Sequence, residues 1–184
     1  AIMAGAYAVY HGPEGIRRIA ERIRALASVL ASGLESLGHE ILTGGFFDTL
    51  RVRPLDGSED LFARAVSCGI NLRDFEDGTV GIALDEVTTP DDLDELFLIF
   101  SAGNEPDFDA GELARKSEPF ELPSWAIRKT PYLEHEVFNS YHSETEMLRY
   151  LHKLESRDLS LNTSMIPLGS CTMKLNATSQ MQGV

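Results

Sequence analysis

Residues 13–38, PEGIRRIAERIRALASVLASGLESLG, carry the pattern that decides the fold. Apolar residues recur there at steps of three and four, the spacing of one face of an α-helix. Pro13 suits the first helical position, where its missing N–H has no intrahelical partner to lose. Gly38 suits the left-handed residue that ends a helix. The stretch therefore predicts one long amphipathic helix, and its apolar stripe consists of Ile16, Ile19, Ile23, Leu26, Leu30, Leu34 and Leu37.

Strand patterns and two shorter helices follow this helix. Residues 46–53, 70–75 and 79–84 have the composition of strands, and Glu76-Asp77-Gly78 joins the last two as a hairpin. Residues 59–68 read as a short helix ended by Gly69, and Thr89 followed by Pro90 starts another that ends before Gly103. The order is helix, strand, helix, hairpin, helix. Residues 13–103 therefore predict a small α+β domain with helices packed on a mainly antiparallel sheet.

The flanking stretches differ from this domain. Residues 1–12 begin with AIMAGAYAVY and read as the end of a helix from a truncated upstream domain, because that apolar surface would otherwise have nothing to bury against. Residues 104–130 read as a linker, because prolines and acidic residues interrupt any periodicity. The alternative for the two ends of the chain is ordinary frayed termini.

The composition limits the classes of partner. A net charge of −13 disfavours nucleic acid and anionic membranes, which would repel such a surface. No apolar run approaches the ~20 residues of a membrane-spanning helix. Cys68 and Cys171 lie far apart, which suits free thiols in a reducing compartment.

Residues 131–184 include a predicted helix and a run of polar donors. Ser143 and Glu146 fit a capping box, which predicts a helix over residues 144–155. Its expected buried stripe is Met147, Leu148, Leu151 and Leu154. His142 and His152 lack the spacing of a zinc motif, so we expect no metal site.

The run MIPLGSCTMKLN, residues 165–176, places four donor side chains at alternate positions. In an extended chain these four residues share one side, which suits a carboxylate or a phosphate. An edge strand with its polar side in water explains the same pattern, and the residues alone leave both interpretations open. The four donors are Ser170, Thr172, Lys174 and Asn176.

Three strings resemble the P-proteins of the glycine cleavage system: AYAVYHGPEGIRRIAERI at residues 6–23, HEVFNSYHSETEMLRYLHKLESRDLSL at 135–161 and PLGSCTMKLNAT at 167–178. The resemblance covers nearly the entire chain and weakens in the linker and at Gln182-Gly183-Val184. It implies a fragment that spans the junction of the two halves of such an enzyme. Both halves have a type I, aminotransferase-like fold. The second half binds pyridoxal phosphate (PLP), and the first half is its degenerate partner. Residues 13–103 would be the small C-terminal domain of the degenerate first half, and residues 131–184 the N-terminal arm of the PLP-binding half.

The resemblance also implies a reaction and its partners. P-proteins use PLP to decarboxylate glycine and pass the aminomethyl group to the lipoyl arm of H-protein, with T- and L-proteins completing the cycle. The assembly is a homodimer or a pair of half-subunits. The compartment is the cytoplasm, or the mitochondrial matrix in a eukaryote.

The resemblance finally points to site residues. The arm of related enzymes reaches the active-site mouth, so the candidates for binding substrate or cofactor anions are Ser170, Cys171, Thr172, Lys174 and Asn176, with His142 close by. The Schiff-base lysine of the family lies in a downstream segment, and none of Lys116, Lys129, Lys153 and Lys174 has that context. We therefore expect no catalytic residue here and an inactive fragment. The alternatives are a non-catalytic interaction domain derived from a P-protein, or part of another type I PLP enzyme.

Overall fold

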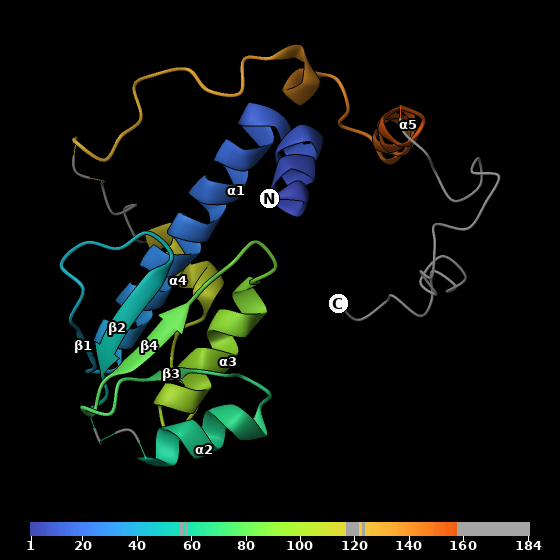
Figure 1. Cartoon of the computed structure of the whole chain (residues 1–184). Coiled ribbons are helices and arrows are strands. Elements are labelled where there is room, and N and C mark those ends of the chain that lie inside the picture. The colour runs from blue at the N-terminus through green and yellow to red at the C-terminus, as the bar shows by residue number, and fades with distance from the viewer. Residues whose placement is uncertain (56, 58, 117–121, 123, 158–184) are drawn as a thin grey trace, which may run out of the picture. The chain divides into compact units, whose positions relative to one another are not determined.

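The computed structural model describes residues 1–55, 57, 59–116, 122 and 124–157 (Figure 1). The chain divides into two compact units. One unit combines Ala1–Pro13 with the described part of Tyr132–Val184, and the other is Glu14–Pro131.

The long helix α1, Ile2–Ser36, contains a break at the position that the sequence indicates. Gly12 has φ 62° and ψ −179°, a backbone conformation that interrupts the helix and that side chains with a Cβ rarely adopt. Pro13 follows at the start of the second helical stretch. At the other end, Gly38 has φ 89°, the N–H of His39 donates to the carbonyl of Leu34, and the N–H of Gly38 donates to that of Glu35. This paired pattern is a Schellman motif, which confirms the predicted stop.

The sheet in the described part of the chain has four antiparallel strands in the order β1-β2-β4-β3. The strands are β1 Glu40–Ile41, β2 Thr49–Arg53, β3 Arg73–Asp74 and β4 Val80–Ala83. In β2, Leu50 and Val52 are fully buried whereas Thr49 and Arg53 are exposed, the alternation of a strand with one covered face. The predicted hairpin is confirmed, because β3 pairs with β4. Strand β1, which is only two residues long, was not predicted from the sequence.

Three further helices belong to the same unit: α2 Glu59–Ser67, α3 Pro90–Phe100 and α4 Ala110–Lys116. Thr89 caps α3, as the sequence predicts, and it forms a capping box with Asp92. The linker interpretation of residues 104–130 did not include α4. Its first residue, Ala110, is buried, and its N–H donates to the carboxylate of Asp94 at 2.7 Å. This anchoring of a seven-residue helix depends on a residue sixteen positions away, so local periodicity does not reveal it.

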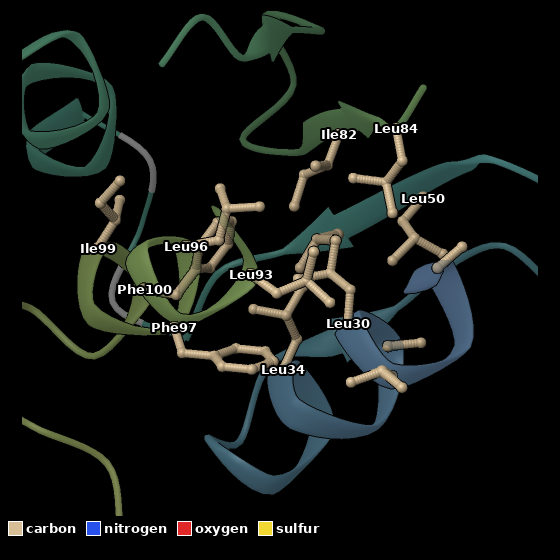
Figure 2. Packing of buried hydrophobic residues seen from close by; sticks show 14 of the residues in the cluster. Leu30, Leu34, Leu50, Ile82, Leu84, Leu93, Leu96, Phe97, Ile99 and Phe100 are labelled. Atoms are coloured by element: carbon tan, nitrogen blue, oxygen red, sulfur yellow. The ribbon is translucent and has the colours of Figure 1, made fainter. Parts of the chain in front are cut away.

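One hydrophobic core holds the helices of this unit against a face of the sheet. Figure 2 shows Leu93 and Phe97 of α3 directed toward Leu30 and Leu34 of α1, with Leu50 of β2 nearby. Leu30, Leu34, Leu50 and Leu93 are completely inaccessible to solvent. The unit is therefore a two-layer mixed α/β domain, in agreement with the predicted α+β architecture.

The other unit contains a 3-10 helix, η1 Glu136–Asn139, and helix α5 Glu144–Glu155. The predicted bounds and capping box of α5 are confirmed. The predicted buried stripe is wrong, because Leu148, Leu151 and Leu154 are 60%, 45% and 41% exposed and α5 has no buried residue. The leucines do share one helix face, but the described residues of this chain do not cover it.

Candidate functional site

A histidine contact joins two distant parts of the first unit. Nδ1 of His142 lies 2.8 Å from the carbonyl oxygen of Tyr10, 132 residues earlier in the chain. A Cβ on Gly12 would lie 2.7 Å from Cε1 of His142 and 2.7 Å from the carbonyl oxygen of Phe138. Two features therefore require a glycine at position 12: the positive φ of Gly12 and the close approach of His142 and the Phe138 carbonyl. His142 is the sequence-predicted candidate that the structure describes, and its side chain is exposed.

A second hydrogen bond supports the same junction. The hydroxyl of Tyr132 donates to the carbonyl oxygen of Pro13 at 2.7 Å. Because Pro13 follows the helix break, the carbonyl groups of Tyr10 and Pro13 flank Gly12 and each accepts a side-chain donor from residues 132–142. The break in α1 is thus fixed by the segment that precedes α5.

Acidic groups surround the start of α5. The hydroxyl of Ser143 accepts from the N–H of Glu146, and the Glu146 carboxylate accepts from the N–H and the hydroxyl of Ser143 at 3.2 and 2.8 Å. These hydrogen bonds, led by that of the Ser143 side chain, lower the pKa of Glu146, and its electrostatic interaction with His142 acts in the same direction. Glu144 adds another carboxylate in the same turn. The helix N-terminus is therefore already satisfied by carboxylate and is poorly suited to a phosphate.

Aromatic rings gather in this unit. The rings of Tyr7 and His11 have centroids 4.2 Å apart, and Tyr10 meets His11 edge-on at 5.2 Å. Tyr141 and Tyr150 stack at 4.4 Å with an interplanar angle of 20°. Tyr7 and Tyr10 are 36% and 38% exposed, so the cluster presents amphipathic rings to solvent.

The domain of Glu14–Pro131 contains a shallow pocket of about 270 Å³ near the end of β4 and the start of α3. Ile70, Leu72 and Leu96 contribute apolar walls, and Asp85 and Asp92 contribute carboxylates. Both carboxylates are engaged locally. The side chain of Thr88 is the largest cause that lowers the pKa of Asp85, and the backbone of Thr89 is the largest cause that lowers the pKa of Asp92. The pocket lining includes no lysine, arginine or histidine, so it does not favour an anionic ligand.

Five of the six predicted site residues, Ser170, Cys171, Thr172, Lys174 and Asn176, lie outside the described residues. Within the described residues no group of three or more His, Cys, Asp and Glu side chains could hold a metal, and no helix is long and apolar enough to cross a bilayer. Cys68 is exposed and free.

PLP requires a lysine for its aldehyde and donors for its phosphate. Lys116, Lys129 and Lys153 are all exposed, and Lys116 pairs with Glu112 at 3.6 Å. None of these three lysines lines the pocket, whose charged residues are both acidic. This pocket and these three lysines therefore do not fit PLP.

The family model described as "Glycine cleavage system P-protein" matches residues 1–100. A relative from Nostoc punctiforme, glycine dehydrogenase (decarboxylating), is 55% identical over 187 residues, covering 98% of this chain and 19% of the relative. The mitochondrial enzyme of the same name from Pisum sativum is 49% identical over 182 residues, covering 99% of this chain and 17% of the relative. The glycine dehydrogenase (decarboxylating) of Serratia proteamaculans is 51% identical over 180 residues.

The chain spans less than a fifth of the length of these three relatives. The matches to them are nevertheless continuous over nearly all of it, and the family model matches 100 of its 184 residues. The residue strings and the family model indicate the same family. The chain belongs to the glycine cleavage system P-protein family.

Proposed function

We propose that this chain is part of a PLP-dependent glycine dehydrogenase (decarboxylating), to which it contributes scaffold and a substrate-facing segment. The whole enzyme releases CO2 from glycine and transfers the aminomethyl group to the lipoyl arm of H-protein, and T- and L-proteins complete the cycle. One observation carries the proposal: the identity to enzymes of that name, 55% and 49% in a cyanobacterium and a plant, extends over 98% and 99% of the chain.

The proposal assigns a role to each stretch. Residues 13–103 form the small domain of a type I, aminotransferase-like half, and the antiparallel sheet with helices on one face supports this assignment. Residues 104–130, with α4, connect it to residues 131–184, the arm of the PLP-binding half. When bound, PLP supplies an electron sink for the carbanion left by decarboxylation. We assign its covalent attachment to the lysine segment of the family, because none of Lys116, Lys129, Lys153 and Lys174 has the sequence context of that segment.

The assembly and compartment follow from the same proposal. The enzyme acts as a homodimer of one long chain or as paired half-subunits, in the cytoplasm or, in a eukaryote, in the mitochondrial matrix. Ser170, Cys171, Thr172, Lys174 and Asn176 bind substrate or cofactor anions in this enzyme.

A chimeric enzyme tests the function. This chain replaces the region of the Nostoc punctiforme relative that it matches. We expect glycine decarboxylation, measured as exchange of labelled bicarbonate into glycine with lipoylated H-protein, within about tenfold of the parent, a barrier change of about 1.4 kcal/mol. The matched control is the parent carrying only the junction changes. A folded chimera without exchange contradicts the proposal and favours the alternative of a non-catalytic interaction domain, to which the exposed leucine face of α5 would be suited.

Two arm variants then test the anion-binding residues. In the chimera, Lys174→Ala and Thr172→Ala should lower decarboxylation more than they lower thermal stability. Normal turnover in both variants would make residues 170–176 a purely structural stretch.

The chain alone provides a further check. Mixed with PLP, it should show no stable aldimine absorbance, because the lysine segment of the family is absent from it. A borohydride-reducible adduct at one defined lysine would overturn this expectation.

A further inference from the structure

The two ring nitrogens of His142 have different surroundings. Nδ1 lies 2.8 Å from the carbonyl oxygen of Tyr10. A carbonyl oxygen can only accept, so Nδ1 carries the proton and donates it. In the neutral imidazole, Nε2 then holds the lone pair. No hydrogen bond to a described residue engages Nε2, so the fixed tautomer leaves an acceptor available.

The ring is also fixed in orientation. Its Cε1–Nε2 edge lies over Gly12, where an added Cβ would come within 2.7 Å of Cε1 and 3.4 Å of Nε2. The absence of a side chain at Gly12 is therefore what lets the ring reach the Tyr10 carbonyl. The His142 side chain remains exposed, so a ligand can approach Nε2 from solvent.

The charges around His142 select the class of ligand. From α5, the carboxylate of Glu146 interacts electrostatically with His142. From η1 and α1, the neighbouring groups are the carbonyl oxygens of Phe138 and Tyr10, which also carry negative partial charge. Such surroundings favour the ammonium end of a zwitterionic ligand over its carboxylate end, because they attract a cationic group that carries N–H donors. A small primary ammonium group has this chemistry.

We propose that Nε2 of His142 binds the ammonium group of a small amino acid substrate and accepts a proton from it. The inference rests on the proposed function, in which that substrate is glycine, and it assigns His142 to the amine where sequence analysis expected an anion. In the step, one N–H bond of the ammonium breaks and one Nε2–H bond forms, giving a neutral amine and an imidazolium. The imidazolium keeps its hydrogen bond to Tyr10 and gains attraction to Glu146.

The first test uses the chain itself. Nitrogen-15 NMR of the histidine rings at neutral pH should show His142 protonated at Nδ1 and unprotonated at Nε2. Gly12→Ala, which crowds the ring, should abolish this preference, whereas Gly5→Ala, which adds a Cβ in open space, should leave it unchanged. An Nε2-protonated tautomer in the unaltered chain would overturn the proposal, whatever the chimera shows.

The second test separates a chemical role from a structural one in the chimera. His142→Asn keeps a donor near the position of Nδ1 but has no atom at Nε2, whereas His142→Gln can reach the Nε2 position but loses the Nδ1 donor. We expect His142→Asn to retain the melting temperature and to lose at least about tenfold, and up to ~10⁴-fold, in kcat/KM for glycine, the range of one proton-transfer group. It should also lose the acid limb of the pH profile.

If His142→Asn retains both the melting temperature and kcat/KM, then His142 has only a structural role in this segment and the proposal is wrong. A chimera that is inactive with His142 intact contradicts the proposed function, and the NMR experiment then still decides whether Nε2 is held as a free acceptor. Decarboxylation in the unaltered chimera together with an unchanged pH profile in His142→Asn would refute the inference while the proposed function stands.

Discussion

The ring of Phe97 lies directly against Gly33, so that a Cβ on Gly33 would come within 2.2 Å of Cε1 and 2.4 Å of Cζ. Phe97 is 1% exposed and cannot move out of the core. Gly33→Ala should therefore destabilise the domain by about 1–3 kcal/mol, the usual cost of overpacking, even though alanine favours a helix over glycine by about 1 kcal/mol. Urea unfolding followed by circular dichroism measures the difference.

Gly5 provides the matched control for this substitution. It lies in the same helix, α1, but an added Cβ there meets nothing within 4 Å. Gly5→Ala should be neutral or should stabilise by up to about 1 kcal/mol through helix propensity alone. Equal changes in the two variants would show that the Phe97 contact does not determine the effect at Gly33.

The cap of α3 predicts a response to pH. The N–H and hydroxyl of Thr89 each donate to the Asp92 carboxylate at 2.7 Å, and the backbone bond, followed by the side-chain bond, lowers the pKa of Asp92. Because the folded-state pKa lies below the unfolded value, this stabilisation is present above about pH 4 and is lost as the pH falls through the folded-state pKa. The free energy of unfolding should therefore fall less between pH 6 and pH 3 in the Asp92→Asn variant than in the unaltered chain. Denaturant titration at the two pH values measures the difference.

Thr89→Ala tests the cap at neutral pH. It removes the hydroxyl that accepts from the N–H of Asp92 at 3.3 Å and should cost about 1 kcal/mol. Its pH dependence should also flatten, because part of the cause of the Asp92 shift is removed. A variant with unchanged stability and unchanged acid sensitivity would mean that this cap contributes nothing measurable.

Truncation of a leucine to alanine should strongly destabilise the domain at one helix and have almost no effect at another. Leu34 is completely buried in the core, so Leu34→Ala should cost about 2–5 kcal/mol. Leu151 on α5 is 45% exposed, so Leu151→Ala should change the unfolding free energy by less than about 0.5 kcal/mol. Thermal and urea unfolding of both variants measures this. A loss at Leu151 comparable to that at Leu34 would mean that another part of the chain covers α5 in solution.

The sequence predicts those parts of the fold that local chemistry determines. The capping boxes of Thr89 and Ser143 each use a side chain and a carboxylate three residues apart, so their pattern is visible in the sequence. The Gly38 stop is equally local. Strand β1 and helix α4 were missed because distant partners stabilise them: Glu40–Ile41 is held by pairing with β2, and Ala110 by Asp94.

The same distinction between local and distant determinants applies to the candidate site. A leucine stripe on α5 is visible as periodicity, but periodicity cannot show what covers it, and the expected burial was wrong. Similarly, the strings around residue 142 drew attention to His142, whereas its partner Tyr10 is 132 residues away and contributes only a backbone carbonyl, which carries no sequence signal. Gly12 offered the nearest clue, since it breaks an otherwise helical pattern.

The open face of the sheet supports a final prediction, centred on Arg51. Its Nε donates to the hydroxyl of Thr79 at 2.9 Å, its terminal nitrogen pairs with Asp77 at 2.5 Å, and its guanidinium lies 4.4 Å from the centroid of the Phe75 ring. Lysine preserves the charge but has neither the Nε donor nor the planar group that stacks on the ring. Arg51→Lys should therefore cost about 0.5–1.5 kcal/mol, the net contribution of one hydrogen bond.

Arg53, two residues further along β2, is the control for this effect. It pairs with Glu40 across the strands, and both side chains are more than half exposed, at 55% and 60%. Because such an exposed pair contributes little and lysine can replace its charge, Arg53→Lys should stay within about 0.5 kcal/mol of the unaltered chain. The Arg51→Lys loss should also persist at high salt, since screening weakens ion pairs more than hydrogen bonds to a hydroxyl. If salt abolishes it, the charge of Asp77 and not the hydroxyl of Thr79 is the partner that stabilises this face of the sheet.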